Sequence, residues 1–309
     1  MVQKEDEVLK SWLLALLRDP VDGCPLRLES ESLIGAADRP YPIVRSVARF
    51  VPSEKYAGTF GYQWNLFAKT QLDSANGTTR SRDTFVDKTG FSLEKLRGRT
   101  VLDVGCGMGR FAEVVAQAGA RVVGVDLSQA VDAAAANLAG FENAAVVQAD
   151  LFSLPFAPES FDVIYSVGVL HHTPNTRRAF QALLPYLRDG GKIAIWVYPR
   201  TLRWKYPMSL LYRLVTPRIS RDRLLRWCET AVRSRLIQQP GPIGSVLRRL
   251  FQISARGDID WLVLDAFDWY SPRFQWTHTE AQVEAWFREA GLKDLWRGRA
   301  AVSIGGAKP

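Results

Sequence analysis

The sequence predicts an α/β fold in which strands and helices alternate around a mostly parallel sheet. Residues 101–104 form an apolar strand that carries Asp103 and runs directly into a glycine-rich turn. Residues 110–120 follow as one helix, and residues 122–126 form a second apolar strand that ends in Asp126. A strand, a helix and a second strand of these lengths are typical of parallel α/β sheets.

The turn after the first strand indicates a cofactor site. Glycine occupies every second position of this turn, at residues 105, 107 and 109. Because glycine has no Cβ and adopts positive φ readily, such a turn can press its backbone amides against a ligand. Asp126 stands about twenty residues further along, where a carboxylate can accept hydrogen bonds from ribose hydroxyls. These features predict a nucleoside cofactor.

The spacing of the glycines distinguishes two kinds of nucleoside cofactor. A dinucleotide fingerprint has a glycine three residues after its second glycine, whereas Arg110 holds that position here. A carboxylate beside the turn, such as Asp103, would repel a pyrophosphate but would suit a cationic ligand that carries an amine. S-adenosylmethionine has an ammonium and a sulfonium group and therefore fits both observations.

Residues 99–200 resemble the catalytic core of the class I S-adenosylmethionine-dependent methyltransferases, of the methyltransferase type 11 kind. Beyond the glycine turn, the resemblance rests on Asp126-Leu127-Ser128, Gln148-Ala149-Asp150-Leu151, the strand of residues 161–167, and the segment 187–191 that leads into a strand over 192–198. It implies a Rossmann-like sheet with an antiparallel last strand, S-adenosylmethionine as cofactor, and methyl transfer as activity. The alternative that the chain is a degenerate, non-catalytic member of the same fold stays open.

The resemblance also assigns residues to the cofactor. In the family an acidic residue binds the adenine amine and an apolar residue covers the adenine face, and these roles fall to Asp150 and Leu151. The full set of expected cofactor-binding residues is Asp103, Gly105, Cys106, Gly107, Gly109, Asp126, Leu127, Asp150, Leu151 and Val167.

Two neighbouring histidines, His171 and His172, follow the fourth strand. This place lies at the carboxyl end of the sheet, where open α/β folds bind their ligands. An amine or an acidic hydroxyl needs only positioning for in-line transfer, whereas a hydroxyl of high pKa needs a base, and either histidine is a candidate. The alternative is that the pair only orients its loop. His278 is the third histidine of the chain.

Some reaction classes lack their characteristic residues. Residues 166–169 read Ser-Val-Gly-Val, where adenine N6 methylation would use an Asn/Asp-Pro-Pro-aromatic loop. None of Cys24, Cys106 and Cys228 is placed as the nucleophile that cytosine C5 transfer requires. The wide separation of these cysteines also allows neither a disulfide framework nor a CxxC metal pair, so we expect a cytoplasmic protein.

The N-terminal unit, residues 1–55, is expected to contain one helix and a small β-rich fold. The apolar run of residues 12–17 is too short to span a bilayer. Residues 19–26, 32–34 and 41–43 resemble segments of the small zinc-ribbon proteins that activate tRNA and protein methyltransferases, but Asp19 and Asp22 stand where a cysteine pair would be. We therefore expect no metal, and favour structural packing over a role in substrate choice. The expected core is Leu28, Leu33, Ile34, Ile43, Val44, Phe50 and Val51.

Residues 56–98 link this unit to the methyltransferase core, which we assign to residues 99–200 and 276–309. Tyr62 and Trp64 lie in an aromatic segment that resembles the entry segment of small-molecule methyltransferases, where such residues close over the cofactor or substrate. Ordinary core packing explains both residues equally well. A helix over 82–96 is expected to lead into the first core strand.

Residues 201–275 are expected to form a helical lid that selects the substrate. From Arg200 to Arg256 the chain has thirteen Lys or Arg residues against two acids, a surplus that exceeds the net charge of +8 for the whole chain. Apolar residues are interleaved with them, which predicts an anionic partner. A phosphorylated or carboxylated small molecule and an anionic membrane surface fit the apolar content better than nucleic acid does. The alternative is that the basic residues form a solvated helix face that binds no partner.

The C-terminal segment is expected to complete the core with a helix after Thr279 and a closing antiparallel hairpin. Asp268, Tyr270 and Arg273, just before it, are candidates for the substrate side. We expect an enzyme that methylates an oxygen or nitrogen of a small-molecule or lipid-like metabolite. The alternatives are an RNA or protein methyltransferase and a non-catalytic cofactor-binding partner subunit.

Overall fold

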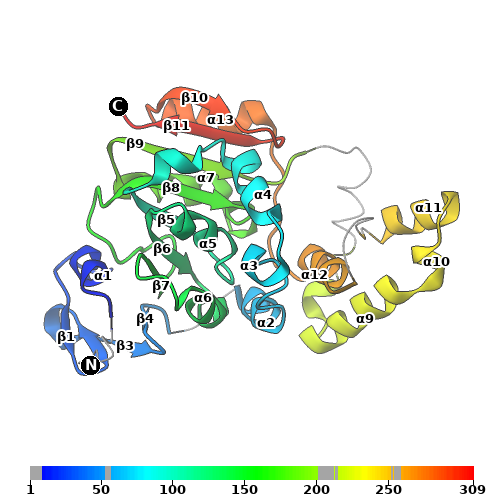
Figure 1. Ribbon diagram of the computed structural model, residues 1–309, viewed down its shortest axis with the longest axis horizontal. Helices are drawn as coiled ribbons and strands as arrows, with labels where there is room; N and C mark the ends of the chain where they lie inside the picture. The colour runs from blue at the N-terminus through cyan, green and yellow to red at the C-terminus, as the bar shows by residue number, and fades with distance from the viewer. Residues whose placement is uncertain (1–8, 53–56, 201–211, 213–214, 252, 254–258) are drawn as a thin grey trace.

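The computed structural model describes residues 9–52, 57–200, 212, 215–251, 253 and 259–309, and it shows a single sheet covered by helices (Figure 1). The strand order is β1-β2-β3-β4-β7-β6-β5-β8-β9-β11-β10. The central parallel strands are β5 (Thr100–Val104), β6 (Arg121–Asp126), β7 (Ala144–Gln148), β8 (Phe161–Val167) and β9 (Leu187–Trp196). Strand β11 (Ser303–Ala307) runs antiparallel between β9 and β10 (Lys293–Arg297). The predicted α/β fold with an antiparallel closing strand is confirmed.

Every residue of β5 is buried, because helices cover both faces of the sheet. Leu102 and Val104 belong to the core on one face, with Phe180 of α7 (Thr176–Gln181) and Phe287 of α13 (Glu280–Glu289). Val101 belongs to the core on the opposite face. That face is covered by α4 (Arg80–Thr89), α5 (Arg110–Gln117) and α6 (Ala130–Leu138). Because successive side chains of a strand point to opposite faces of the sheet, β5 contributes residues to both cores.

The chain between the N-terminal unit and the core forms α2 (Gly58–Leu66), α3 (Asp73–Asn76) and then α4. The helix expected over 82–96 is shorter than predicted. It ends at Thr89 because Gly90 adopts a left-handed conformation with φ of 70°, and residues 93–96 form a separate 3-10 turn.

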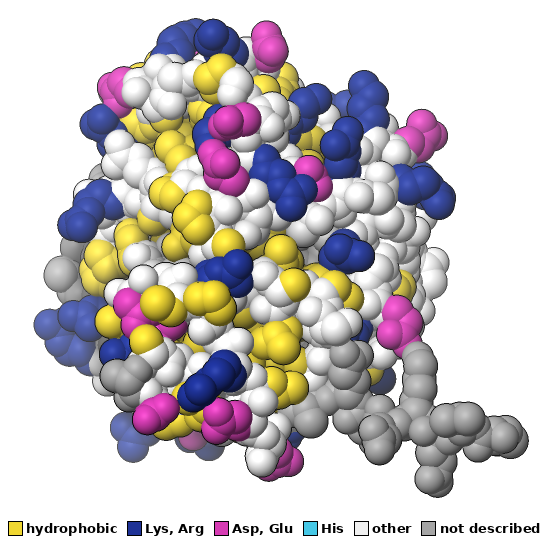
Figure 2. All heavy atoms as spheres, turned by 90° about the vertical axis from the view of Figure 1, so that its left-hand side faces the viewer, with side chains coloured by type: hydrophobic (Ala, Val, Ile, Leu, Met, Phe, Trp, Pro, Cys, Tyr) yellow, Lys and Arg dark blue, Asp and Glu magenta, His cyan; other side chains and the backbone are white. Residues whose placement is uncertain are grey.

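The N-terminal unit extends the main sheet. Its strands are β1 (Arg27–Glu29), β2 (Ser32–Ile34), β3 (Pro40–Val44) and β4 (Val47–Arg49), preceded by α1 (Ser11–Leu16). Strand β4 pairs in parallel with β7, so that Ala48 lies beside Val147. Leu33 therefore belongs to the same core as the central strands. The face that shows this unit has basic and acidic side chains interspersed (Figure 2).

Two of the core positions predicted for this unit are wrong. Val44 and Leu28 are 45% and 38% exposed. Strand β3 alternates strictly, with Tyr41 and Ile43 facing inward, so Val44 must face solvent. All three residues of β1 are exposed because β1 is the edge strand of the sheet.

A buried carboxylate organises the N-terminal unit. Asp19 is 1% exposed and accepts hydrogen bonds from Arg39 Nη1 at 2.9 Å, from the Tyr41 hydroxyl at 2.8 Å and from the Val21 amide at 2.9 Å. A Cβ on Gly35 would lie 2.0 Å from Asp19 Oδ2, so only glycine leaves room for the carboxylate. Within the described residues, no group of three His, Cys, Asp or Glu side chains could hold a metal ion.

The insertion after β9 is helical where it is described. It contains α9 (Arg221–Arg233), α10 (Arg235–Gln238), α11 (Pro242–Leu250) and α12 (Ile259–Tyr270), and most of residues 201–214 lie outside the described residues. These helices form a core of their own, which includes Leu224, Cys228, Val263 and Phe267. None of the helices in the described part is long and apolar enough to cross a membrane.

We expect Asp19→Ala to lower the free energy of unfolding by about 2 kcal/mol, because the substitution leaves the buried Tyr41 hydroxyl without its partner and removes a charge-assisted bond. Urea denaturation monitored by tryptophan fluorescence measures the change. Asp38→Ala is the matched control, since the Asp38 side chain is 92% exposed. Equal stability of the two variants would show that Asp19 does not organise the unit.

Candidate functional site

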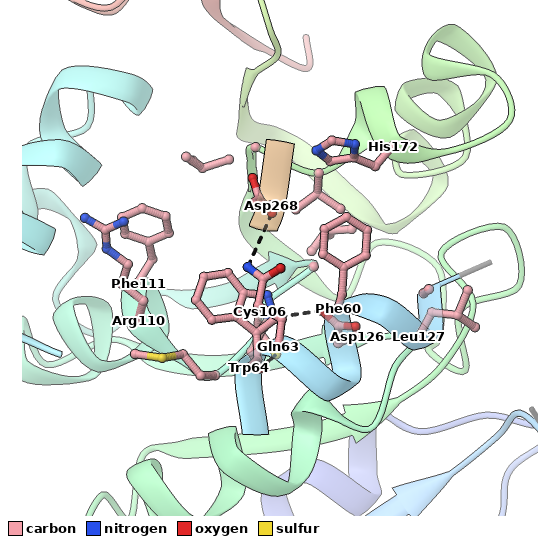
Figure 3. Close-up of a pocket in the computed structure, with 18 of the residues that line it drawn as sticks. Phe60, Gln63, Trp64, Cys106, Arg110, Phe111, Asp126, Leu127, His172 and Asp268 are labelled. Atoms are coloured by element: carbon pink, nitrogen blue, oxygen red, sulfur yellow. Dashed lines mark hydrogen bonds between the residues drawn. The ribbon is translucent and has the colours of Figure 1, made fainter. Parts of the chain in front are cut away.

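A cavity of about 260 Å³ lies at the carboxyl ends of the central strands. Its floor is the turn between β5 and α5 together with the ends of β6, β7 and β8. The remaining walls come from helices α2, α4, α5 and α12, from the turn of residues 168–173 and from the end of β9 (Figure 3). The linker, the core and the lid therefore all contribute. The position agrees with the general rule that open α/β sheets bind ligands at these strand ends.

The glycine turn brings the backbone to the cavity surface. Gly105 has φ of 79°, and a Cβ on it would lie 2.4 Å from the Val169 methyl groups. Gly107 has φ of 54°, and a Cβ on it would lie 3.2 Å from the Trp64 indole nitrogen. Both positions therefore require glycine for conformation and for space. Gly105, Cys106 and Gly107 line the cavity, whereas Gly109 starts helix α5 behind it.

One end of the cavity has the features expected for a nucleoside. The carboxylate of Asp126 accepts a hydrogen bond from the Gly107 amide at 3.0 Å, and Asp126, Leu127 and Leu151 all line the cavity. Figure 3 shows Asp126 and Leu127 together at this end. Asp150, expected on the adenine amine, does not line the cavity. Its Oδ1 accepts the Phe152 amide at 3.0 Å and so holds the turn that presents Leu151.

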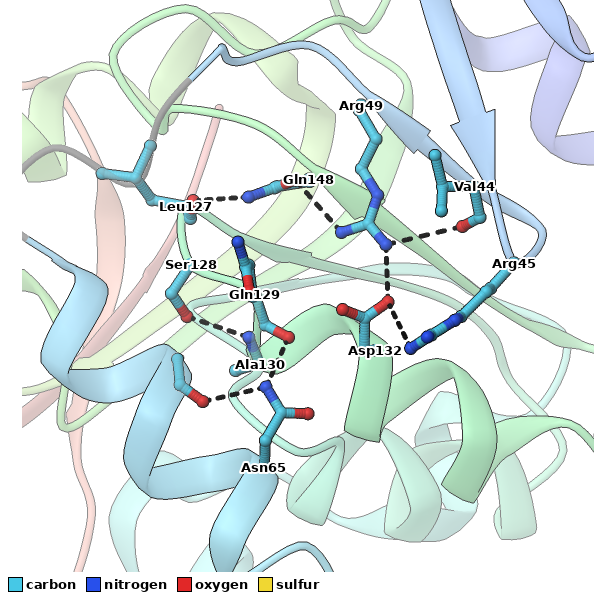
Figure 4. A network of polar contacts seen from close by, with 11 residues as sticks. Val44, Arg45, Arg49, Asn65, Leu127, Ser128, Gln129, Ala130, Asp132 and Gln148 are labelled. Carbon is cyan, nitrogen blue, oxygen red and sulfur yellow. Dashed lines mark hydrogen bonds and ion pairs between the residues drawn. The ribbon is translucent and has the colours of Figure 1, made fainter.

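The N-terminal unit supports the Leu127 loop through a chain of hydrogen bonds (Figure 4). Arg49 of β4 donates to Gln148 Oε1 at 3.0 Å and pairs with Asp132 at 2.6 Å. Gln148 Nε2 in turn donates to the Leu127 carbonyl at 3.0 Å. Sequence reasoning missed Arg49, because nothing in its local sequence shows that β4 pairs with β7.

Asp103 lies beneath the turn rather than on the cavity wall. It is 2% exposed, and its Oδ2 has no hydrogen-bond partner among the described residues. Burial raises the pKa of this carboxyl to about 7. An orphaned carboxylate oxygen below the turn, together with the glycine cradle, fits a cationic nucleoside such as S-adenosylmethionine. Gly105, Gly107, Asp126, Leu127 and Leu151 would hold it.

Only one histidine of the pair lines the cavity. His172 lines the cavity, and its Nδ1 lies 2.9 Å from the Phe274 carbonyl oxygen. Because a carbonyl can only accept, Nδ1 carries the proton. His171 is fully buried outside the cavity and packs on the Tyr198 ring at 3.9 Å between centroids. The two follow each other in a 3-10 turn, and their rings stay in contact, with 4.1 Å between the ring centroids.

The residues expected on the substrate side are also separated. Trp64 and Asp268 line the cavity, as does Val167, which we expected to bind the cofactor. The Tyr62 hydroxyl instead donates to Asp222 of the lid at 2.9 Å, since residues two apart on helix α2 face different ways. Tyr270 and Arg273, predicted on the substrate side, do not line the cavity. Tyr270 is 2% exposed in the lid core and donates to the Phe251 carbonyl, and Arg273 is exposed to solvent.

Several charged residues of the cavity escaped the sequence analysis. Lys88 of α4 and Arg110 of α5 line it, and Asp265 joins Asp268 on α12. Burial raises the pKa of Asp265 to about 7. Asp268 accepts the Tyr198 hydroxyl at 3.1 Å and Gln63 Nε2 at 3.4 Å. The available signal was the presence of three acids, Asp260, Asp265 and Asp268, on the otherwise apolar helix of residues 259–270.

Comparisons with known proteins agree with this site. Residues 102–195 match the family model described as a methyltransferase domain. The chain is 32% identical to an uncharacterized methyltransferase of Mycobacteroides abscessus, over 60% of this chain and 71% of that protein. It is 34% identical to a ubiquinone biosynthesis O-methyltransferase of Bordetella bronchiseptica, but it spans 64% of that relative's length and the match covers 52% of this chain.

Among solved structures, the chain is similar to an S-adenosylmethionine-dependent methyltransferase from Mesorhizobium loti. The sequence identity is 32% with a TM-score of 0.30, over 32% of this chain and 47% of that chain. The strand order, the glycine turn and the sequence matches give one conclusion: this chain belongs to the class I S-adenosylmethionine-dependent methyltransferases.

Proposed function

We propose that this protein methylates an oxygen or nitrogen of a small-molecule or lipid-like metabolite. The observation that carries the proposal is the extent of the cavity, which continues from the nucleoside end past the glycine turn to the polar walls of α4 and α12. A walled space of this kind suits a compact acceptor better than a large macromolecular surface. When bound, S-adenosylmethionine supplies a methyl group on an activated sulfonium sulfur.

Most of the rate is expected to come from positioning. Phe60 and Trp64 of α2 cover the glycine turn from one side, and Leu264 of α12 faces the same cavity. These apolar walls exclude water and hold the acceptor close to the methyl donor. The protein therefore needs little covalent chemistry of its own.

His172 is the group we assign as base for a hydroxyl acceptor of high pKa. Its Nδ1 proton is held by the Phe274 carbonyl, which fixes the ring and leaves Nε2 as the basic nitrogen. The acceptor proton would move to Nε2 as the new bond to the methyl carbon forms. An amine or an acidic hydroxyl would use the same cavity without this step.

Relatives named as ubiquinone biosynthesis O-methyltransferases support oxygen as the acceptor atom. An RNA or protein methyltransferase is the rival that the N-terminal resemblance to zinc-ribbon activators favours. A non-catalytic partner subunit would bind the cofactor and release no S-adenosylhomocysteine with any acceptor. A turnover assay with phenols, quinols, amines and RNA, read as release of S-adenosylhomocysteine, distinguishes the three.

We also propose that the protein is cytoplasmic and that its lid contacts anionic membranes, from which a lipid-like acceptor could enter. On α11, Ile243, Val246 and Leu250 are 63%, 53% and 39% exposed, and their spacing places them on one side of the helix. Arg248 and Arg249 follow on the same helix. An exposed apolar face beside arginines is typical of helices that lie on anionic lipid surfaces.

Gly105→Ala is expected to weaken S-adenosylmethionine binding at least tenfold, because the new methyl group would overlap Val169 and force an unfavourable φ. Isothermal titration calorimetry measures the Kd. Gly140→Ala is the matched control, since a Cβ on Gly140 meets nothing within 4 Å. Unchanged affinity of Gly105→Ala would show that the turn does not hold the cofactor.

His172→Ala is expected to slow transfer to a hydroxyl acceptor by a factor of about 100 to 10,000, the usual contribution of a general base. S-adenosylhomocysteine affinity should stay within twofold of wild type. His278→Ala serves as control because His278 Nε2 contacts Thr176 and the ring lies outside the cavity. Full activity of His172→Ala with such an acceptor would remove His172 from the mechanism.

The double substitution Ile243→Asp with Val246→Asp is expected to reduce binding to phosphatidylglycerol vesicles about tenfold or more, because it removes apolar contact and adds negative charge. Cosedimentation measures the bound fraction. Val21→Asp is the control, since Val21 is 68% exposed on the N-terminal unit. Equal sedimentation of all three proteins would exclude the lid as the contact.

A further inference from the structure

We propose that Lys88 and Arg110 form a subsite for an anionic group of the methyl acceptor, a carboxylate or a phosphate. The inference rests on the proposed function, because it assigns the acceptor to the cavity beside the cofactor. It also narrows that function to acceptors that carry a negative charge. Both cations line this cavity, Lys88 from α4 of the linker and Arg110 from α5 of the core.

In the part of the chain that the structure describes, no ion pair neutralises this pair of cations, although Asp73, Asp265 and Asp268 lie near enough to raise the pKa of one or both of them. Arg110 donates through Nε to Ser81 Oγ at 2.9 Å, through Nη1 to Gln71 Oε1 at 2.9 Å and through Nη2 to Thr84 Oγ1 at 3.5 Å, all of them neutral acceptors. Lys88 Nζ lies 3.4 Å from the centre of the Trp196 ring. Among the described residues, no carboxylate forms an ion pair with either cation.

Two neighbouring cations in a walled cavity repel each other, and both burial and this repulsion favour loss of a proton. Burial, and next the charge of Arg110, lower the pKa of Lys88 to about 7. Burial likewise lowers the pKa of Arg110 to about 10. A bound anion would relieve both effects, whereas the empty pair costs free energy of folding. The arrangement is therefore typical of a site prepared for a ligand.

The carboxylates of α12 do not act as the counterion that a bound anion would supply. Asp268 is engaged by the Tyr198 hydroxyl and by Gln63, and Asp265 faces the cavity without forming an ion pair with Lys88. Burial and the charge of Asp268 raise the pKa of Asp265, which weakens it further as a counterion near neutral pH. Asp265 instead limits how strongly an anion can bind.

The position of the pair within the sheet favours the acceptor over the nucleoside. Trp196, which Lys88 covers, ends β9, and β9 lies three strand positions from β6, whose end carries Asp126. At the usual strand spacing, these ends are about 14 Å apart. Figure 3 likewise shows Arg110 on the opposite side of the cavity from Asp126 and Leu127.

A second polar group indicates the rest of the acceptor. Gln63 is 1% exposed, lines the cavity, and has a buried Oε1 without a hydrogen-bond partner among the described residues. A buried amide oxygen is costly unless a donor reaches it. The acceptor that satisfies this wall carries a hydroxyl or an amine in addition to its anionic group.

The test uses phenyl phosphate and benzoate as probes, titrated by calorimetry into the protein saturated with S-adenosylhomocysteine. We expect Lys88→Met to weaken both probes at least tenfold, to leave uncharged benzamide unaffected, and to leave S-adenosylhomocysteine affinity within twofold. Lys88→Arg should restore anion binding to within about threefold. Lys95→Met is the control, because Lys95 is exposed on the surface.

Two further arms report on the charges that face Lys88, namely Arg110, Asp265 and Asp268. Asp265→Asn should tighten both probes, because it removes the opposing carboxylate. Benzoate affinity should fall as the pH rises through about 7, where Lys88 loses its proton and Asp265 gains its negative charge, and Lys88→Met combined with Asp265→Asn should abolish this dependence. Thermal unfolding of each variant verifies that it is folded.

The outcomes are distinguishable. If wild type binds S-adenosylhomocysteine but neither anionic probe, the subsite is refuted and the proposed function stands. If Lys88→Met weakens S-adenosylhomocysteine as strongly as the probes, the pair serves the carboxylate of the cofactor and the proposal is overturned. If wild type does not bind S-adenosylhomocysteine, the proposed function fails and the inference fails with it.

Discussion

The close approach of the backbone after β5 is the constraint on which the rest of the site depends. Gly105 leaves no room for a side chain beside Val169, and Gly107 leaves little beside Trp64. The Gly107 amide is also tied to the carboxylate of Asp126 at the end of β6. One turn therefore fixes the distance between two strand ends and the helix α2 above them. The cavity exists because Gly105 and Gly107 of this turn add no side chains to its floor.

The segments outside the core contribute support on one side and enclosure on the other. The N-terminal unit pairs with β7 and, through Arg49 and Gln148, holds the loop that presents Leu127. The unit is itself held by the buried Asp19, which bonds Arg39 and Tyr41. The lid has its own core, and of its described residues only those on one side of α12 line the cavity. A lid with an independent core can diverge to fit new acceptors while the cofactor end stays intact.

The charges that surround the cavity also differ between its two ends. Asp103 and Asp126 place negative charge near the glycine turn, where a cationic cofactor is expected. Lys88 and Arg110 place positive charge at the β9 side, and the arginine is held by neutral oxygens that preserve its charge. This polarity orients an acceptor before transfer, so that its anionic end and its reacting atom lie at different places. Orientation of this kind is the main contribution a protein can make when the methyl group is already activated.

The sequence by itself determined the α/β fold, the glycine turn and the nucleoside end of the site, because these depend on local features: apolar runs long enough for strands, glycines where no Cβ fits, and a carboxylate at a strand end. It also identified the histidine pair but could not decide between its members, since only the 3-10 turn and the Phe274 carbonyl direct His172 into the cavity. Arg49, Lys88, Arg110 and Asp265 gained their significance only in the tertiary structure. They come from segments far apart in the chain, and their proximity depends on the order in which the strands pair and on the faces that the helices bury.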